Sequence, residues 1–348
     1  MARSTDPLQA ALTAPIAPME ARLVSALPDE PGWQYEPKWD GFRAIVVRRD
    51  DELVLWSKSG KPLDRYFPEL RTAFLGLGEK RFVLDGEIVV PVGSRLSFGA
   101  LQARLHPAAS RVERLSHETP AQIVLFDLLH RSADAFGHRP LTDRRAELEA
   151  FHARNATAAI RLSPASADVV QARAWLAEAG GALDGVIAKP LDQSYRTGER
   201  AMAKVKQRRT ADCIVAGFRE TTDGTGVASL LLGLFNDHGE IDHVGFTSGM
   251  PAGERKRLLG RLRPVVGPPG FTGRAPGGPC RWNNGEEKPW FPLRTELVVE
   301  VGYDQVTDGR FRHGTTLVRW RPDKRPDQCT TEQLQRELSP AEMRALLA

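Results

Sequence analysis

The sequence lacks the long apolar segments that mark membrane-spanning or exported proteins. Among its 348 residues the longest apolar run, around 230–235, has the length of a strand, whereas a transmembrane helix needs about 20 apolar residues. Asp6, Glu20 and three prolines interrupt the N-terminal region, where a secretory signal would need an unbroken apolar block. We therefore expect no membrane span and a cytoplasmic location.

Cysteine is also scarce. The three cysteines, Cys213, Cys280 and Cys329, are widely separated and odd in number, which argues against a disulfide framework or a zinc site and suits a reducing compartment. Neither sign of charge dominates, because 48 Lys and Arg residues against 44 Asp and Glu residues leave a formal net charge of +4. This excess permits a polyanionic partner such as nucleic acid but does not by itself indicate one.

The length corresponds to roughly two domains. Residues 1–20, with several prolines among small residues, predict a flexible N-terminal segment. Residues 21–208 mix β-rich runs with helical patterns, which predicts an α+β domain. Two β-rich runs within 43–56 flank an acidic pair and predict a hairpin. Further strands are expected at 82–90, 122–129 and 183–190, and helices at 97–105, 143–154 and 169–179.

Residues 209–348 have a different pattern, with short strands separated by turns rich in Gly and Asp. Five such strands in about 110 residues are typical of a small β-barrel such as an OB-fold. A helix is expected near 251–262, a long loop at 263–292, and a helical tail after the capping box at 339–342. The five strands are expected at 213–220, 229–237, 243–249, 296–304 and 315–323.

The most informative string is EPKWDGFR at 36–43. A lone lysine near the end of a strand is usually a solvated surface residue. Lys38, however, is followed along the chain by LDGEIV at 84–89, LDGVIAK at 183–189 and KVK at 204–206. A lysine, two carboxylates and paired lysines in this order are the separated parts of a nucleotide site.

This series resembles the covalent nucleotidyltransferases, which comprise ATP-dependent DNA ligases, RNA ligases and mRNA capping enzymes. The defining family pattern Lys-x-Asp-Gly-x-Arg is met by residues 38–43. SKSG at 57–60, LFDLL at 125–129 and RWRPDK at 319–324 are similar to further motifs of the family, in the family's order. The resemblance extends over roughly residues 20–330 and implies an adenylation (nucleotidyltransferase) domain at 21–208, followed by an OB-fold domain with a C-terminal helical tail at 209–348.

The resemblance also implies roles for individual residues. Lys38 is the implied nucleophile that takes AMP from ATP, with Arg43, Lys204 and Lys206 as catalytic partners. Glu36 is implied to lie beside the adenine, and Phe126 is implied to stack on it. The other residues implied to bind the nucleotide are Lys58, Glu87, Lys189, Arg200, Arg321, Asp323 and Lys324. The implied ligands of a divalent ion, Mg²⁺ or Mn²⁺, are Glu87 and Asp184.

The chemistry explains why these residue types are needed. Attack on the α-phosphorus of ATP requires a neutral amine, whereas a lysine ammonium ordinarily has a pKa of about 10.4. Nearby positive charge from an arginine, paired lysines and a metal ion disfavours the ammonium and favours the nucleophile. The basic side chains and the metal also neutralise the phosphate charge as pyrophosphate leaves.

Several of these residues have ordinary structural alternatives. Phe126 could belong to the core, Glu36 could cap a turn, and Lys58 and Arg200 could be solvated surface residues. The sequence also departs from the family at two positions. Asp184 stands where relatives carry glutamate, and although it is one methylene shorter it remains a hard oxygen ligand. Met202 stands where relatives often carry an aromatic residue.

Among the relatives, the strings at 36–43 and 319–324 look most like small bacterial ATP-dependent DNA ligases that lack an N-terminal DNA-binding domain. They are especially similar to the ligase module of bacterial end-joining enzymes. The implied function is sealing of nicks in duplex DNA through lysyl-AMP and 5′-adenylated DNA, by a nucleoid-associated monomer acting in repair. Ku or a repair polymerase are the candidate recruiting partners.

Two other functions stay open at this stage. An RNA ligase or a capping-type guanylyltransferase would share the motifs, and labelling with ATP or GTP would separate them. An OB-fold nucleic-acid-binding protein with an inactive nucleotide site is the non-enzymatic alternative. The intact Lys38, Glu87 and Lys206 argue against that alternative.

Overall fold

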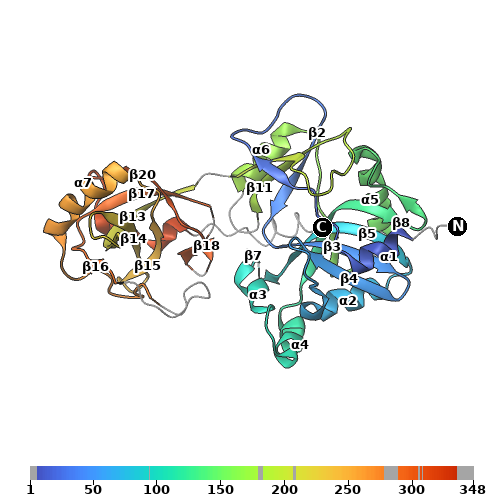
Figure 1. The fold of residues 1–348 in the computed structure, drawn as a ribbon, viewed down its shortest axis with the longest axis horizontal. Helices are drawn as coiled ribbons and strands as arrows, with labels where there is room; N and C mark the ends of the chain where they lie inside the picture. The colour runs from blue at the N-terminus through green and yellow to red at the C-terminus, as the bar shows by residue number, and fades with distance from the viewer. Residues whose placement is uncertain are drawn as a thin grey trace. The chain divides into compact units, whose positions relative to one another are not determined.

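The chain divides into two compact units in the computed structural model, with the boundary near residues 207–208 (Figure 1). The structure describes residues 6–93, 95–178, 183–206, 209–277, 289–304, 306–307 and 309–334. Both units combine helices and strands, which confirms the predicted α+β class. No helix in these ranges is long and apolar enough to cross a membrane. The capping box expected at 339–342, the helical tail after it and Cys280 lie outside the described residues.

The first unit contains two sheets. A four-stranded sheet has the order β1-β12-β11-β2, and a larger sheet has the order β10-β8-β5-β3-β4, with β9 paired to β8. The strands of the first sheet are β1 (Ala21–Leu23), β2 (Trp33–Trp39), β11 (Leu183–Pro190) and β12 (Met202–Val205). Those of the second are β3 (Phe42–Arg49), β4 (Glu52–Ser57), β5 (Arg81–Val89), β8 (Gln122–Arg131), β9 (Asp134–Ala135) and β10 (Ile160–Leu162).

The helices of this unit cover the sheets. In Figure 1, α6 lies beside β2 and β11, and α5 lies beside β8. The helices and short elements are α1 (Pro7–Thr13), η1 (Asp64–Tyr66), α2 (Pro68–Leu75), β6 (Pro91–Val92), β7 (Arg95–Leu96), α3 (Phe98–Ala103), α4 (Ala109–Glu118), α5 (Leu141–Asn155) and α6 (Val169–Glu178). The predicted hairpin, strands and helices of this half are therefore confirmed, within a few residues at their ends.

The larger sheet is apolar on both faces because each face is covered. On β3, Ala44 and Val46 face one buried cluster, while Ile45 and Val47 face another that includes Leu8 of α1. This alternation explains the unbroken apolar run of the strand, since side chains one residue apart point to opposite faces.

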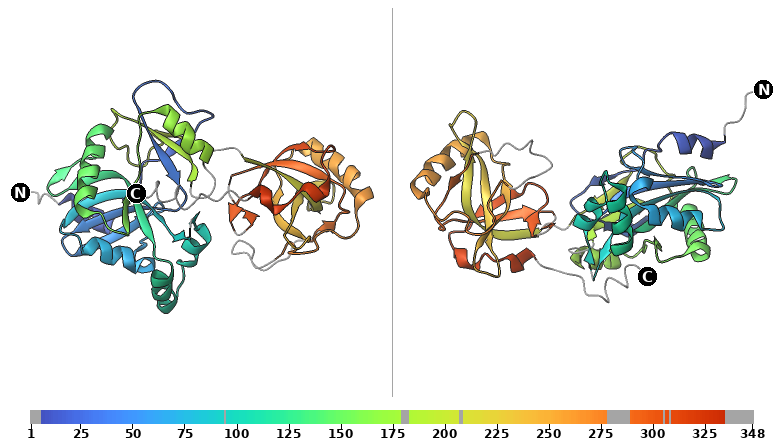
Figure 2. Two further views of the ribbon diagram at one scale, coloured as in Figure 1. Left: turned by 180° about the vertical axis from the view of Figure 1, so that it is seen from behind. Right: turned by 90° about the horizontal axis from the view of Figure 1, so that it is seen from below.

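The prediction of a flexible segment at 1–20 is wrong for residues 7–13, which form helix α1. Asp6 caps α1 by accepting a hydrogen bond from the backbone of Leu8, and Pro7 occupies the first turn, a position where its missing N–H costs nothing. Leu8 and Ala11 are buried against the face of the sheet that carries β3 and β4, where Figure 2 shows α1 in dark blue. The helix is only seven residues long, so it depends on this packing rather than on its own propensity.

The second unit contains the five predicted strands. They form a sheet in the order β15-β14-β13-β17-β20, with β16 paired to β13. Among the described residues, β15 and β20 are not joined by a continuous ladder; a single bridge links Thr247 to Thr315. The expected loop at 263–292 includes a short helix and a strand. The elements are β13 (Arg209–Glu220), β14 (Val227–Phe235), β15 (Ile241–Thr247), α7 (Ala252–Leu262), η2 (Arg263–Val265), β16 (Phe291–Pro292), β17 (Val298–Tyr303), β18 (Val306–Thr307), β19 (Arg310–Phe311), β20 (Thr316–Trp320), η3 (Pro326–Gln328) and η4 (Thr331–Leu334).

Candidate active site

Strand β2 carries one wall of the candidate site. Its alternate residues point to opposite sides of the sheet: Tyr35 joins a buried apolar cluster, whereas Glu36 and Lys38 line a cavity, which Trp39 of the same cluster also borders. The antiparallel register with β11 places Gln34 opposite Lys189. Residues about 150 positions apart in the sequence thus become neighbours through strand pairing.

The cavity has a volume of about 200 Å³ and lies entirely within the first unit. It brings together residues of both sheets that the sequence motifs had singled out. Asp184 lies next to the cavity, where it forms ion pairs with both Lys38 and Lys206. The predicted residues that line it are Glu36, Lys38, Arg43, Lys58, Glu87, Phe126, Lys189 and Lys204.

Lys38 and Lys206 share one carboxylate. Lys38 Nζ lies 2.5 Å from Asp184 Oδ2, and Lys206 Nζ lies 3.0 Å from the same oxygen. Asp184 is almost fully buried, whereas the Lys38 side chain is 22 % exposed and reachable from the cavity. The residue that replaces the usual glutamate of the family therefore contacts the predicted nucleophile directly.

The donor set suits a metal ion bound together with phosphate rather than by protein alone. No group of three or more His, Cys, Asp or Glu side chains in the described ranges could hold a metal ion by itself. Magnesium is commonly bound by one or two carboxylates plus substrate phosphates. Glu87, in the cavity wall, and Asp184, beside Lys38, are hard oxygen donors of that kind.

Burial and charge alter the titration of two residues in the cavity wall. Burial raises the pKa of Glu87 to about 7, although the positive charges of Arg43 and Lys38 oppose the rise. Burial also lowers the pKa of Lys204, and the charges of Lys38, Lys206 and Lys58 lower it further. Groups with shifted pKa values that gather in one cavity are typical of functional sites.

Glu87→Gln should stabilise the metal-free protein in a pH-dependent way. The pKa of Glu87 is about 7 when folded and 4.5 ordinarily, so the folded protein binds the proton more tightly and its free energy of unfolding falls as pH rises between these values. The neutral amide avoids this loss and should be more stable at pH 8 by up to about 3 kcal/mol, at 1.36 kcal/mol per pKa unit. Urea unfolding at pH 4.5 and pH 8 measures the difference in free energy of unfolding between the variant and the unsubstituted protein. This difference should nearly vanish at pH 4.5, and an equal difference at both pH values would contradict the prediction.

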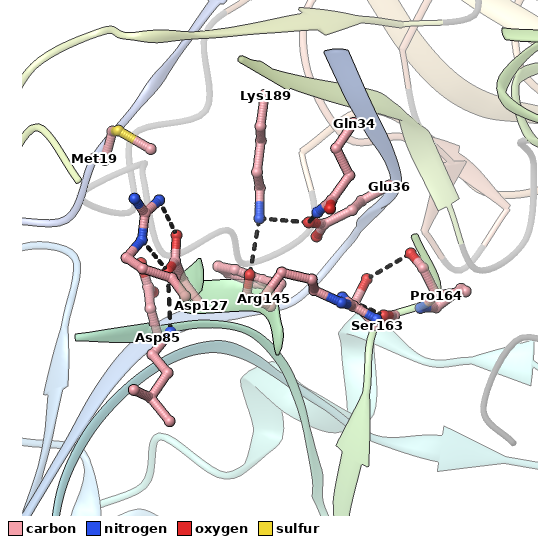
Figure 3. A network of polar contacts seen from close by, with 12 residues as sticks. Met19, Gln34, Glu36, Asp85, Asp127, Arg145, Ser163, Pro164 and Lys189 are labelled. Atoms are coloured by element: carbon pink, nitrogen blue, oxygen red, sulfur yellow. Dashed lines mark hydrogen bonds and ion pairs between the residues drawn. The ribbon is translucent and has the colours of Figure 1, made fainter. Parts of the chain in front are cut away.

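A buried polar network joins strand β2, which carries Lys38, to β11. Lys189 Nζ lies 2.7 Å from Glu36 Oε1 and donates to the backbone oxygen of Phe126 at 2.9 Å. Gln34 donates to the same Glu36 oxygen at 2.8 Å. Figure 3 shows the three side chains of Gln34, Glu36 and Lys189 converging. Glu36 is therefore part of a buried ion pair and does not cap a turn.

Phe126 is buried yet reaches the cavity. The guanidinium of Arg43 lies 4.6 Å from the centre of its ring, and Lys189 Nζ lies 4.8 Å from it. The ring therefore belongs both to an apolar cluster and to the cavity wall, so its position fits a stacking platform as well as a core residue.

Phe126→Ala should weaken ATP binding by about 1–3 kcal/mol if the ring stacks on the adenine, whereas Phe126→Tyr should have little effect. The measurement is the KM for ATP in covalent labelling. Phe151→Ala is the matched control, because Phe151 is a fully buried ring outside the cavity. It should lower Tm without changing KM. If Phe126→Ala likewise lowers Tm without changing the KM for ATP, Phe126 is a core residue and does not stack on the adenine.

Three residues that sequence reasoning did not identify complete the site. Arg43 donates to both carboxylate oxygens of Asp85, at 2.5 and 2.6 Å, and to the backbone oxygen of Met19 at 3.2 Å. Tyr195 donates to Asp85 at 2.6 Å. Asp85 stands inside the string LDGEIV, and an aspartate in an otherwise apolar strand was the signal that could have revealed it. Met19 and Tyr195 have no comparable signal.

Lys58 and Arg200 meet a common acidic partner at the N-terminal segment. Lys58 Nζ lies 3.1 Å from Glu20, and the Arg200 guanidinium lies 3.8 Å from it. Lys58 lines the cavity, whereas Arg200 is 75 % exposed in its side chain. The structure therefore brings Lys58 to the site and leaves Arg200 on the surface.

The remaining predicted residues belong to the second unit. Arg321 pairs with Asp323 at 2.9 Å and with Asp212 of β13 at 2.8 Å, and Lys324 lies 3.5 Å from Asp212. The hydrogen bond from Arg321 lowers the pKa of Asp323 to about 2. The motif is thus held together at the end of β20.

Comparison with known protein families gives two matches that together span most of the chain. Residues 17–206 match the family described as ATP dependent DNA ligase domain, and residues 223–324 match the ATP dependent DNA ligase C terminal region. These two ranges lie within the first and second structural units, respectively.

Individual relatives are similar along most of the chain. A protein named DNA ligase C2 from Mycolicibacterium smegmatis is 45% identical over 336 residues, which is 92% of this chain and 94% of that protein. The multifunctional non-homologous end joining protein LigD from Mycobacterium bovis is 30% identical over 311 residues, which is 86% of this chain and 37% of that protein. The solved structure Pmar-Lig_PreS3 superposes with a TM-score of 0.58 at 15% identity, covering 88% of this chain and 68% of that one, and supports the fold alone.

Proposed function

Because the chain belongs to the ATP-dependent DNA ligase family, we propose that it seals nicks in duplex DNA, through a lysyl-AMP intermediate and a 5′-adenylated DNA intermediate. The observation that carries the proposal is the amine of Lys38 at a cavity walled by Arg43, Glu87 and Lys189. In this proposal residues 21–208 act as the adenylation domain and residues 209–348 as the OB-fold domain.

In the first step Lys38 Nζ attacks the α-phosphorus of ATP, a phosphoramidate bond forms, and the bond to pyrophosphate breaks. In the free protein the amine of Lys38 is paired with the Asp184 carboxylate, so attack requires that this contact be released and that Asp184 be engaged by another cation. Lys206, 3.0 Å from the same oxygen, is one such cation. A divalent ion, Mg²⁺ or Mn²⁺, held by Glu87 and Asp184 would carry a larger positive charge than Lys206 and would neutralise charge on the phosphates.

The other cavity residues bind and orient the nucleotide. Glu36 and Lys189 offer an acceptor and a donor to the edge of the adenine, and Phe126 supports its face. Arg43, Lys58 and Lys204 supply positive charge to the phosphates and ribose, with Arg200 at the surface nearby. Arg321, Asp323 and Lys324 orient the departing pyrophosphate, a positioning role.

In the later steps AMP passes from Lys38 to the 5′-phosphate at a nick. The 3′-hydroxyl then attacks that phosphate and expels AMP, which leaves a phosphodiester bond. Binding to the phosphate backbone should weaken steeply with salt. The similarity to LigD, a protein named for non-homologous end joining, supports a role in DNA repair. We propose further that the chain acts as a monomer in the cytoplasm at the nucleoid, with Ku or a repair polymerase as recruiting partner.

Incubation with α-labelled ATP and Mg²⁺ or Mn²⁺ tests the proposal directly. The label should become covalently bound to the protein and should leave it when nicked duplex DNA is added, as the nick is sealed. Labelling by GTP in place of ATP would favour a guanylyltransferase, and sealing of nicked RNA alone would favour an RNA ligase.

A further inference from the structure

The backbone around Met19 forms a wall of the nucleotide cavity. Pro18, Met19, Glu20 and Ala21 all line it, although they lie outside every motif of the site. Met19 is held at both ends of its backbone: its N–H donates to the hydroxyl of Tyr195 at 2.9 Å, and its carbonyl accepts from Arg43 at 3.2 Å. This wall is therefore tied to the rest of the cavity by two side chains.

Tyr195 is the point at which three distant segments meet. It lies in the connection between β11 and β12 and is buried. Its hydroxyl accepts from Met19, 176 residues away, and donates to Asp85, 110 residues away. Burial and the neighbouring Asp85 charge raise the pKa of Tyr195 well above its ordinary value, so the hydroxyl keeps the proton that it donates.

Asp85 connects this hydroxyl to Arg43. Asp85 is fully buried, and its two oxygens accept from Arg43 Nε and Nη2. Nη2 also serves the Met19 carbonyl. Arg43 therefore has its Nε and Nη2 groups committed to the protein, and Nη1 is the group that it can offer to an anion in the cavity.

We propose that Tyr195 is a positioning residue for ATP, whose hydroxyl holds the Met19 wall and the Asp85 carboxylate in the arrangement that orients Arg43 toward the nucleotide. This inference rests on the proposed function, since it names a residue that shapes the same site. Tyr195 is not among the residues that line the cavity, so it acts through Met19 and Asp85.

Tyr195→Phe should impair nucleotide binding more than chemistry. The variant keeps the ring but leaves the buried N–H of Met19 without an acceptor and Asp85 without one of its donors. The wall and Arg43 should then lose their fixed positions. We expect the Kd and the KM for ATP to rise about tenfold, while kcat for covalent labelling, which depends on Lys38, changes less than about twofold.

Tyr35→Phe is the matched control. Tyr35 is also buried, and its hydroxyl donates a short hydrogen bond to the backbone oxygen of Pro28 at 2.6 Å, but Tyr35 does not line the cavity. The control should lower Tm to a similar extent and leave the Kd and KM for ATP unchanged. Combining Tyr195→Phe with Asp85→Asn should raise the Kd by less than the product of the two separate effects, because both changes break one network.

Titration calorimetry with ATP, together with labelling kinetics, decides the matter. Equal ATP affinity in Tyr195→Phe and Tyr35→Phe would overturn the inference and leave Tyr195 a structural residue. Absence of covalent label in the unsubstituted protein would contradict the proposed function alone, because the comparison of Kd values still reports on Tyr195. Failure of the unsubstituted protein to bind ATP would overturn both.

Discussion

Replacement of Lys38 by arginine should abolish covalent labelling by ATP and with it the sealing of nicks. A guanidinium stays protonated above about pH 12 and offers no lone pair to the α-phosphorus. Its positive charge can still pair with Asp184, as the ammonium of Lys38 does at 2.5 Å. The arginine variant therefore preserves the local charge while removing the nucleophile, and Lys38→Ala should be equally inactive.

The variant is informative only if it still folds and binds ATP. Its Tm and its Kd for ATP should stay close to those of the unsubstituted protein. Lys80→Arg, at an exposed position outside the cavity, should label normally. Sealing of a nick that carries a pre-adenylated 5′ end should survive in Lys38→Arg, since that substrate bypasses the lysyl-AMP. Covalent AMP in the Lys38 variants would show that another group is the nucleophile.

Asp323→Ala and Lys324→Ala should lose most of the AMP labelling but still seal a pre-adenylated nick. In the proposed mechanism these residues orient the departing pyrophosphate, and no pyrophosphate is present once AMP has been transferred. The structure supports a local effect, because the side chain of Asp323 is 62 % exposed and pairs with Arg321. Its removal should therefore leave the fold of the second unit intact.

The chain contains its own control for this prediction. The tripeptide Arg-Pro-Asp occurs at 321–323 and again at 325–327. Arg325 also pairs with Asp327, whose side chain is 57 % exposed. Asp327→Ala thus removes a similar surface pair and should affect neither step. Normal labelling combined with failed sealing in Asp323→Ala would show that the motif acts on the DNA substrate. If both labelling and sealing were unchanged, the motif would be a solvated surface segment with no role in either step.

Much of the site was predictable because the family motifs identify its residues from short stretches of sequence, without knowledge of the fold. Lys38, Glu87 and Lys189 were predicted from short strings, and all three line one cavity. The strands were predictable for a different reason. A sheet covered on both faces, such as that around β3, requires continuous apolar runs, which are visible in the sequence.

Long-range contacts set the limit of such predictions. The seven-residue helix α1 is stabilised by the sheet on which Leu8 packs, so its own sequence resembles a loop. Likewise, the five expected strands of the second unit do not reveal that the end of β15 is bridged to Thr315, the residue before β20, because the curvature of the sheet depends on how all the strands pair.

The sequence by itself determined the family and the α+β class, since short motifs and apolar patterns encode them, and it predicts Lys38 as the nucleophile. Only the tertiary structure decided which charges meet. It gave Lys38 and Lys206 one carboxylate, that of Asp184, and joined Met19, Asp85 and Tyr195 into one network. Hydrogen bonds act over about 3 Å, and the packing of the sheets and the connections between their strands brings those atoms within that distance.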